Sequence, residues 1–184
     1  ANRTAERRRR RTLALLEMNP IKNRSLKQLL WLGIGSMVMF FAGLTSAYVV
    51  AKPQEHWIDF ILPDWFLFST VTIVISSIIL ITAQARLKKE KSSIFFVFAT
   101  FLLGILFSFF QFKGWESLTQ QGVFLTGPGS NVSGSFLYVI TLAHLVHLIG
   151  GLIALLVIVV NINNGKYTSK DYLGFEMATI YWHF

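Results

Sequence analysis

Long apolar blocks constrain this chain more than any other feature. Four of them run approximately over residues 29–51, 65–85, 94–112 and 136–161, and a fifth spans residues 172–184. A helix needs about 20 residues to cross the hydrocarbon core of a bilayer, and only helices or closed barrels satisfy their backbone there. Runs such as VTIVISSIILIT lack the alternation of barrel strands. The sequence therefore predicts an all-α polytopic membrane bundle of five transmembrane helices. We expect the fifth to be truncated in this sequence, because it is too short to cross.

Composition agrees with a membrane protein. Charged residues make up 14% of the chain, whereas soluble domains carry about 25%. Cysteine is absent, which excludes disulfides and thiolate metal sites.

The cations predict the orientation of the chain. Arg7–Arg11 precede the first apolar block, and the next basic segments, ARLKKEKSS and NNGKYTSKD, fall on the same side of the membrane. Basic loops favour the cytoplasmic side, so we expect residues 1–27 to form a basic cytoplasmic tail ahead of one bundle, residues 28–184. A basic run beside a membrane segment is typical of contact with anionic lipid, and we expect no nucleic acid partner. The Asn19-Pro20 pair predicts a break within the tail.

Two histidines interrupt the fourth apolar block. Thr141, His144, His147 and Gly151 share one helix face, and polar groups in a membrane usually face the bundle interior. Histidines at i and i+3 could share a metal if facing helices supplied further ligands, but they cannot bind opposite faces of one haem. We favour hydrogen bonds to neighbouring helices or to a lipid phosphate.

The last block carries a second polar stripe. Glu176, Thr179 and His183 lie at i, i+3 and i+7, while Tyr181 and Trp182 fall on other sides of the helix. Glu176 is either a proton carrier or an interhelix hydrogen-bond partner, and we favour the second role.

In the first block, small residues that allow close helix packing lie on one side: Ser36, Gly43 and Ala47.

These motifs resemble subunit III of the haem–copper oxidases. The segment GFEMATIYWHF is similar to the family's Gly-Phe-Glu, spacer, Tyr-Trp-His-Phe, and Thr141, His144 and His147 fit its Thr-Gly-x-His-x-x-His run. GSMVMFFAGLTSAYVV resembles the family's Ser-Glu-x-Met-Phe-Phe-Ala helix, and residues 109–118 resemble its Gln-x-x-Glu-Tyr stretch. The resemblance covers about residues 31–184 and fits the five-helix form of the family.

The chain departs from the family pattern at four positions. Met37 and Gly114 replace glutamates, and Leu142 and Leu145 replace glycines. The missing glutamate at position 37 argues against a proton relay in this chain.

The resemblance implies an accessory, non-redox subunit of a cytochrome c oxidase in a bacterial inner membrane. Such a chain has no catalytic residue, cofactor or metal of its own, because haem and copper belong to subunits I and II. Its implied partners are these subunits, membrane phospholipid and, through subunit II, cytochrome c. Membership of a respiratory supercomplex is left open.

Other functions remain open at this point. The chain could serve a quinol oxidase or a nitric oxide reductase-associated homologue. From other classes, it could be a small proton-coupled transporter, or a membrane cytochrome with haem held by His144 or His147 and His183.

Overall fold

The structure is a computed structural model. It describes the backbone of the chain except residues 1, 54–56, 58–59, 90, 128–129, 166 and 168–171, and the side chains from residue 21 onward. The side chains of Arg7–Arg11 lie outside this described part.

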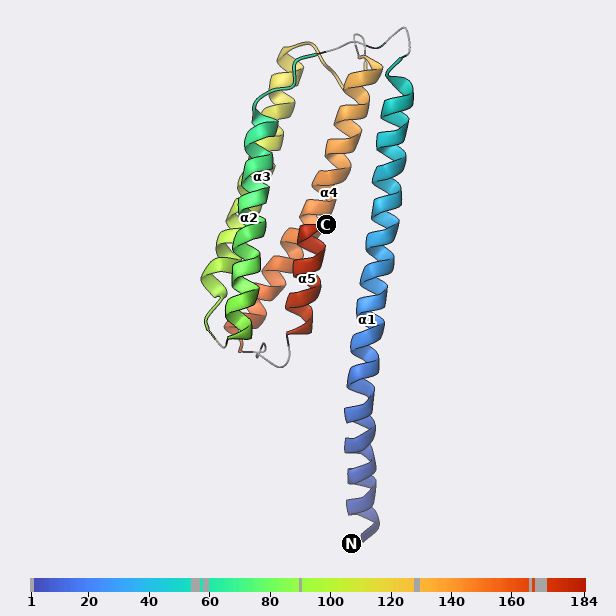
Figure 1. The fold of residues 1–184 in the computed structure, drawn as a ribbon, viewed down its shortest axis with the longest axis vertical. Coiled ribbons are helices and arrows are strands. Elements are labelled where there is room, and N and C mark those ends of the chain that lie inside the picture. The colour runs from blue at the N-terminus through green and yellow to red at the C-terminus, as the bar shows by residue number, and fades with distance from the viewer. Residues whose placement is uncertain are drawn as a thin grey trace. The chain divides into compact units, whose positions relative to one another are not determined.

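All regular secondary structure in the described chain is helical, with no strand, as the sequence predicts. In chain order the helices are α1 (Asn2–Ala51), α2 (Trp65–Lys88), α3 (Ile94–Gln120), α4 (Val132–Asn163) and α5 (Leu173–His183) (Figure 1). Four described segments are long and apolar enough to cross a membrane: Ile21–Ala51, α2, α3 and α4. The chain is therefore a polytopic membrane protein, and α5 contributes 11 residues to its bundle.

Local hydrogen bonds extend two helices beyond their apolar blocks. α4 begins at Val132 because Asn131 caps it, its side chain accepting a hydrogen bond of 2.7 Å from the Gly134 N–H. α3 continues to Gln120, past the predicted end at residue 112, and its added turns carry the ion pair Lys113–Glu116.

The chain divides into two compact units, Ala1–Met37 and Val38–Phe184. The first unit is helical from Asn2, and the break predicted at Asn19-Pro20 is wrong, because α1 runs through Pro20. Proline removes one helical N–H donor, and the helix formers Leu16 and Glu17 precede it.

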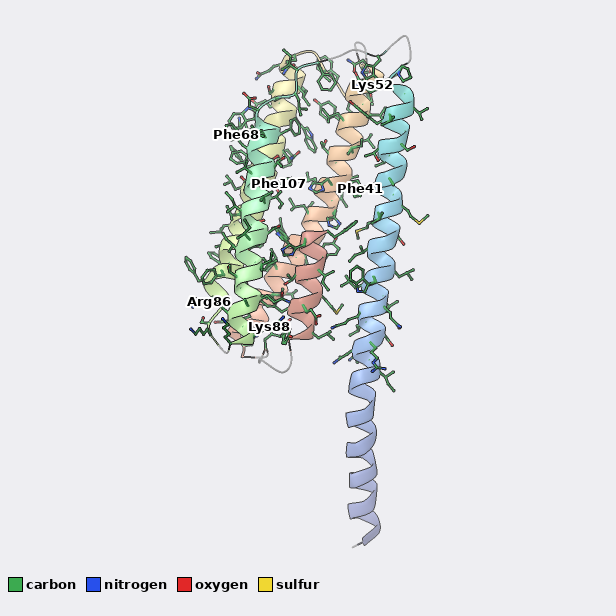
Figure 2. All side chains as sticks on the ribbon, in the orientation of Figure 1. Phe41, Lys52, Phe68, Arg86, Lys88 and Phe107 are labelled. Atoms are coloured by element: carbon green, nitrogen blue, oxygen red, sulfur yellow. The ribbon has the colours of Figure 1, made fainter. Side chains whose placement is uncertain are left out.

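The second unit holds the core, to which α2, α3, α4 and α5 all contribute. Leu80, Val97, Leu155 and Phe175, one from each helix, are each 0% exposed. Figure 2 shows Phe68 on the outer side of α2, where it is 52% exposed. Large apolar side chains on the outside suit a helix bundle surrounded by lipid.

A smaller hydrophobic cluster lies where α2 begins and α3 ends, and it contains Phe66 and Leu118. A Cβ built on Gly114 would lie 2.9 Å from the Phe66 ring. The ring therefore occupies the space of a side chain at position 114, where the family pattern has glutamate.

Candidate functional site

Trp182 joins α5 to three other helices. It is 8% exposed, and its indole N–H donates a hydrogen bond of 3.1 Å to Ser76 Oγ on α2. A Cβ on Gly104 of α3 would lie 2.7 Å from the indole ring, and a Cβ on Gly151 of α4 would lie 3.0 Å from it. The ring therefore fits only because both positions lack a side chain.

Tyr181 makes a second interhelical contact, between α5 and α4 alone. A Cβ on Gly150 would lie 2.6 Å from the Tyr181 hydroxyl, which donates a hydrogen bond of 3.2 Å to the His147 carbonyl. The two rings stack with centroids 4.4 Å apart and planes inclined by 19°. Two adjacent glycines thus receive two adjacent aromatic side chains. We call this region the α5 seat: Ser76, Gly104, His147, Gly150 and Gly151, with Tyr181 and Trp182 bound on them.

The imidazole of His144 lies among other rings. Its ring centroid lies 5.5 Å from Phe107 and 6.4 Å from Phe41. It also lies 6.3 Å from His147, with the two imidazole planes inclined by only 23°. Two imidazoles stacked on one helix cannot act as opposite axial ligands of a haem. Within the described chain no three His, Cys, Asp or Glu residues form a group that could hold a metal ion.

The remaining predicted polar residues are distributed over several helix pairs. Thr141 Oγ1 accepts a hydrogen bond of 3.0 Å from Trp115 Nε1, which joins α3 to α4. The buried Thr179 hydroxyl donates to the Phe175 carbonyl within α5. Glu176 is half-buried in the first turn of α5, where the helix dipole favours a negative charge.

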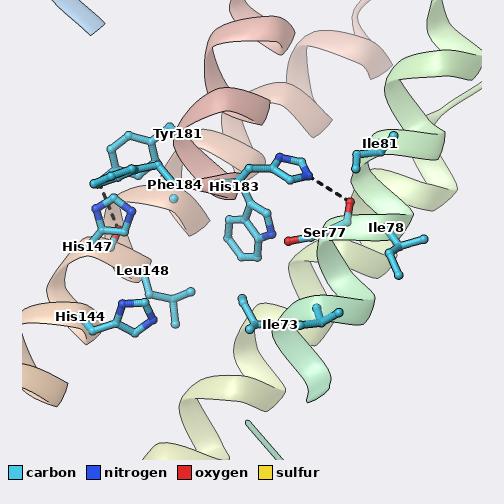
Figure 3. Close-up of a pocket in the computed structure, with 13 residues that line it drawn as sticks. Ile73, Ser77, Ile78, Ile81, His144, His147, Leu148, Tyr181, His183 and Phe184 are labelled. Atoms are coloured by element: carbon cyan, nitrogen blue, oxygen red, sulfur yellow. Dashed lines mark hydrogen bonds between the residues drawn. The ribbon is translucent and has the colours of Figure 1, made fainter. Parts of the chain in front are cut away.

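His183 extends away from α4. Its Nδ1 lies 2.7 Å from the Thr179 carbonyl oxygen and its Nε2 3.2 Å from the Ser77 carbonyl oxygen of α2. Figure 3 shows Tyr181 beside His147 and His183 turned towards Ser77. The polar stripe of α4 therefore meets Tyr181, whereas His183 of the α5 stripe meets α2.

The small residues of α1 are exposed in the described chain. Nothing lies within 4 Å of a Cβ built on Gly43, and Ala47 is exposed. The Ser36 hydroxyl donates to the Leu32 carbonyl of its own helix. Close packing of a second helix on Gly43 and Ala47 stays a prediction.

A cavity of about 370 Å³ lies beside the α5 seat (Figure 3). Its lining combines apolar residues of α2, such as Ile73 and Ile78, with His144 and His147 of α4 and the end of α5.

Sequence reasoning did not identify Trp182, Gly104 or Ser76 as parts of the site. The available signal was glycine at positions 104 and 151, inside strongly apolar helices. Glycine weakens a helix, so its presence there indicates a site of close packing. A second missed pair joins α2 and α3, where Gln111 Nε2 donates a hydrogen bond of 2.9 Å to Ser69 Oγ.

The fold and site define a class: a polytopic membrane helix bundle in which several polar side chains connect neighbouring helices. Comparison with known proteins identifies the family. The sequence model of "Cytochrome c oxidase subunit III" matches residues 18–184, so the chain belongs to the cytochrome c oxidase subunit III family and, with it, to an oxidase complex.

Individual relatives agree with that family. The chain is 29% identical over 173 residues to a probable cytochrome c oxidase subunit 3 of Nocardia farcinica, an alignment that covers 87% of this chain and 80% of the relative. A cytochrome c oxidase subunit 3 of Corynebacterium diphtheriae is 26% identical over 162 residues, covering 80% and 75%. The wheat subunit is 35% identical over 96 residues, covering 52% of this chain and 34% of the relative.

Proposed function

We propose that the chain is the accessory, non-redox subunit III of a respiratory cytochrome c oxidase, which supports subunit I during oxygen reduction and proton pumping. The observation that carries this proposal is the α5 seat. The motif residues Tyr181 and Trp182 are used to fix α5 against α2, α3 and α4. Side chains used in this way stabilise a membrane scaffold.

The redox centres belong, in this proposal, to the partner subunits. Haem and copper lie in subunits I and II, and electrons come from cytochrome c through subunit II. The bacterial relatives named as cytochrome c oxidase subunits support this assignment. The cation distribution supports a cytoplasmic N-terminus, and the actinobacterial relatives support a bacterial inner membrane. The outer apolar surface supports contact with membrane phospholipid.

Purification through a tag on the N-terminal tail tests the proposal. We expect subunits I and II to copurify, and the reduced-minus-oxidised spectrum to show haem bands that an untagged strain does not yield. A copper-binding cysteine pair in subunit II would support cytochrome c as the donor, whereas its absence would favour quinol. A chain that purifies alone would contradict the proposal.

Selective removal of the chain with detergent tests the accessory role. We expect the haem bands to stay with subunits I and II, the initial rate of oxygen consumption to be retained, and turnover to cease after fewer cycles. Haem that leaves with this chain would overturn the non-redox assignment.

A further inference from the structure

Ser77 is the exception among the hydroxyl side chains of α2. The other serine and threonine residues of this helix each donate to a carbonyl of their own helix: Ser69, Thr70, Thr72, Ser76 and Thr82. The Ser77 hydroxyl makes no hydrogen bond within the described chain, and the residue lines the cavity of about 370 Å³ beside the α5 seat. Ser77 lies near the middle of α2, where the bilayer offers no water to satisfy a hydroxyl group.

His144 is a second polar residue of this cavity without a hydrogen bond. Its ring lies among Phe41, Phe107 and His147, and no group in the described part of the chain bonds to its ring nitrogens. It lies about 18 Å along α4 from the first residue of that helix, which is too deep for a lipid phosphate. Unsatisfied polar groups inside a membrane are costly. His144 and Ser77 therefore indicate a ligand that carries polar atoms into the cavity.

The two residues line one cavity from different helices. His144 belongs to α4 and Ser77 to α2, and Figure 3 shows them on different sides. The rest of the lining is mainly apolar and aromatic, and it contains no Asp, Glu, Lys or Arg. Small-molecule sites of roughly 300–1,000 Å³ combine such walls with a few placed polar groups, and the rings of Tyr181 and Phe184 suit a planar ligand. The cavity therefore fits an uncharged ring with a polar atom at each end.

The cavity opens towards lipid. Three residues of α2 that line it are also exposed on the apolar outer surface: Val74, Ile78 and Ile81. A ligand dissolved in the bilayer can therefore enter between the helices without crossing water. An acyl chain could enter by the same route, but it has no polar atom at this depth for His144 or Ser77. A soluble anion would meet no cation in the lining.

We propose that this cavity binds the ring of a membrane-soluble quinone, with one ring oxygen hydrogen-bonded to His144 and the other to Ser77. A quinone dissolves in hydrocarbon and carries two oxygens at opposite ends of a planar ring. Imidazole and hydroxyl groups can each donate or accept a hydrogen bond, so the site suits both the quinone and the quinol form. The proposal assigns binding without a redox step and goes beyond the accessory role.

Equilibrium dialysis of the purified oxidase complex tests the site, with bound ligand measured per complex. The probe is dimethylnaphthoquinone, and the control ligand is dimethylnaphthalene, which keeps the fused rings and lacks both oxygens. The test variants are His144→Phe, which keeps an aromatic ring beside Phe107, and Ser77→Ala. The matched control is Thr82→Val, which removes an α2 hydroxyl that bonds to its own helix and lies outside the cavity lining.

We expect His144→Phe and Ser77→Ala each to weaken dimethylnaphthoquinone binding about three- to tenfold, which corresponds to the loss of one hydrogen bond. Thr82→Val should leave this binding unchanged. Dimethylnaphthalene should bind more weakly, and with equal affinity to the variants and the unmodified complex. His144→Gln keeps a donor and an acceptor, so it should bind the quinone more tightly than His144→Phe. If His144→Phe does not assemble, Ser77→Ala and His144→Gln still test both bonds.

Three outcomes would overturn the proposal. Equal quinone affinity in the test variants and the unmodified complex would show that the ring oxygens do not meet His144 and Ser77. Equal affinity for the two ligands would assign the cavity to an acyl chain or another purely apolar occupant. An assembled complex that binds neither ligand would show that a partner subunit or another segment of the chain fills the cavity. None of these outcomes affects the accessory role, which copurification and removal of the chain test separately.

Discussion

Several polar side chains of this chain connect two helices through a single hydrogen bond. In a bilayer a buried donor without a protein partner meets no water, so buried hydroxyl and indole groups are paired either with a carbonyl of their own helix, as Thr179 is, or with a group on another helix. Ser76 with Trp182 and Thr141 with Trp115 follow this rule. Gln111 follows it in part, since its Oε1 is buried and has no hydrogen-bond partner in the described chain.

The bond between Ser76 and Trp182 can be measured with a double-mutant cycle. The cycle compares Ser76→Ala, Trp182→Phe and the double variant by thermal unfolding of the purified complex. Interhelical hydrogen bonds in membranes contribute about 0.6–1.7 kcal/mol, and we expect a coupling free energy in that range. Additive effects of the two substitutions would show that the indole N–H gains nothing from Ser76.

The unpaired Oε1 of Gln111 predicts that two substitutions differ in their effect on stability. Gln111→Met removes the whole amide, including the unsatisfied oxygen, whereas Ser69→Ala leaves the buried amide N–H without the hydroxyl oxygen that accepts from it. An unsatisfied buried group costs about 1–3 kcal/mol, so we expect Ser69→Ala to lower the unfolding temperature more than Gln111→Met. The opposite order would indicate that Gln111 Oε1 is satisfied in the membrane.

At the scale of helices, glycine positions determine how α5 packs. Gly104 and Gly151 lie on different helices and contact the same indole ring, while Gly150 receives Tyr181. A helix of 11 residues has few buried side chains of its own. Its position therefore depends on the space that these glycines leave.

Gly104→Ala should disrupt this packing. The added methyl group would lie 2.7 Å from both the Trp182 ring and Leu152 Cδ2, and overpacking of this kind costs about 1–3 kcal/mol. We expect a smaller fraction of oxidase complexes to retain the subunit in detergent, as measured by quantitative mass spectrometry.

Gly43→Ala is the matched control, because a Cβ there meets nothing in the described chain. We expect it to have little effect on retention. A larger loss from Gly43→Ala than from Gly104→Ala would instead favour the predicted close packing of a second helix on Gly43 and Ala47.

At the scale of the whole molecule, the proposed role of the chain is to contribute stability and surface to an oxidase complex. Substitutions that weaken its packing should therefore change assembly more than chemistry.

Glu176→Gln should weaken assembly without changing proton pumping. The substitution removes a negative charge that the α5 dipole favours, an effect of about 0.3–1 kcal/mol. We expect fewer complexes to contain the subunit, and an unchanged ratio of protons to electrons in those that do. Full retention of the subunit with half the normal ratio would identify Glu176 as a proton carrier.

Replacing Arg7–Arg11 by glutamines should leave oxygen consumption unchanged. A terminal basic run acts through lipid attraction and orientation, not through the packed core. The measurement is oxygen uptake per haem in purified complexes. Reduced uptake in a fully assembled complex would refute this expectation.

The sequence by itself determined the membrane class, the helical segments and the relationship to oxidase subunit III. Hydropathy is a local property, and each membrane helix satisfies its own backbone, so apolar blocks suffice to locate helices. The tertiary structure alone decided that Trp182 enters the core and that His183 faces α2. Helical periodicity predicts on which face of its helix a residue lies. It does not predict how much room the neighbouring helix leaves for the side chain. Ser76 and Gly104 lie 106 and 78 positions from Trp182 in the chain, and only packing of the bundle brings them to the same ring.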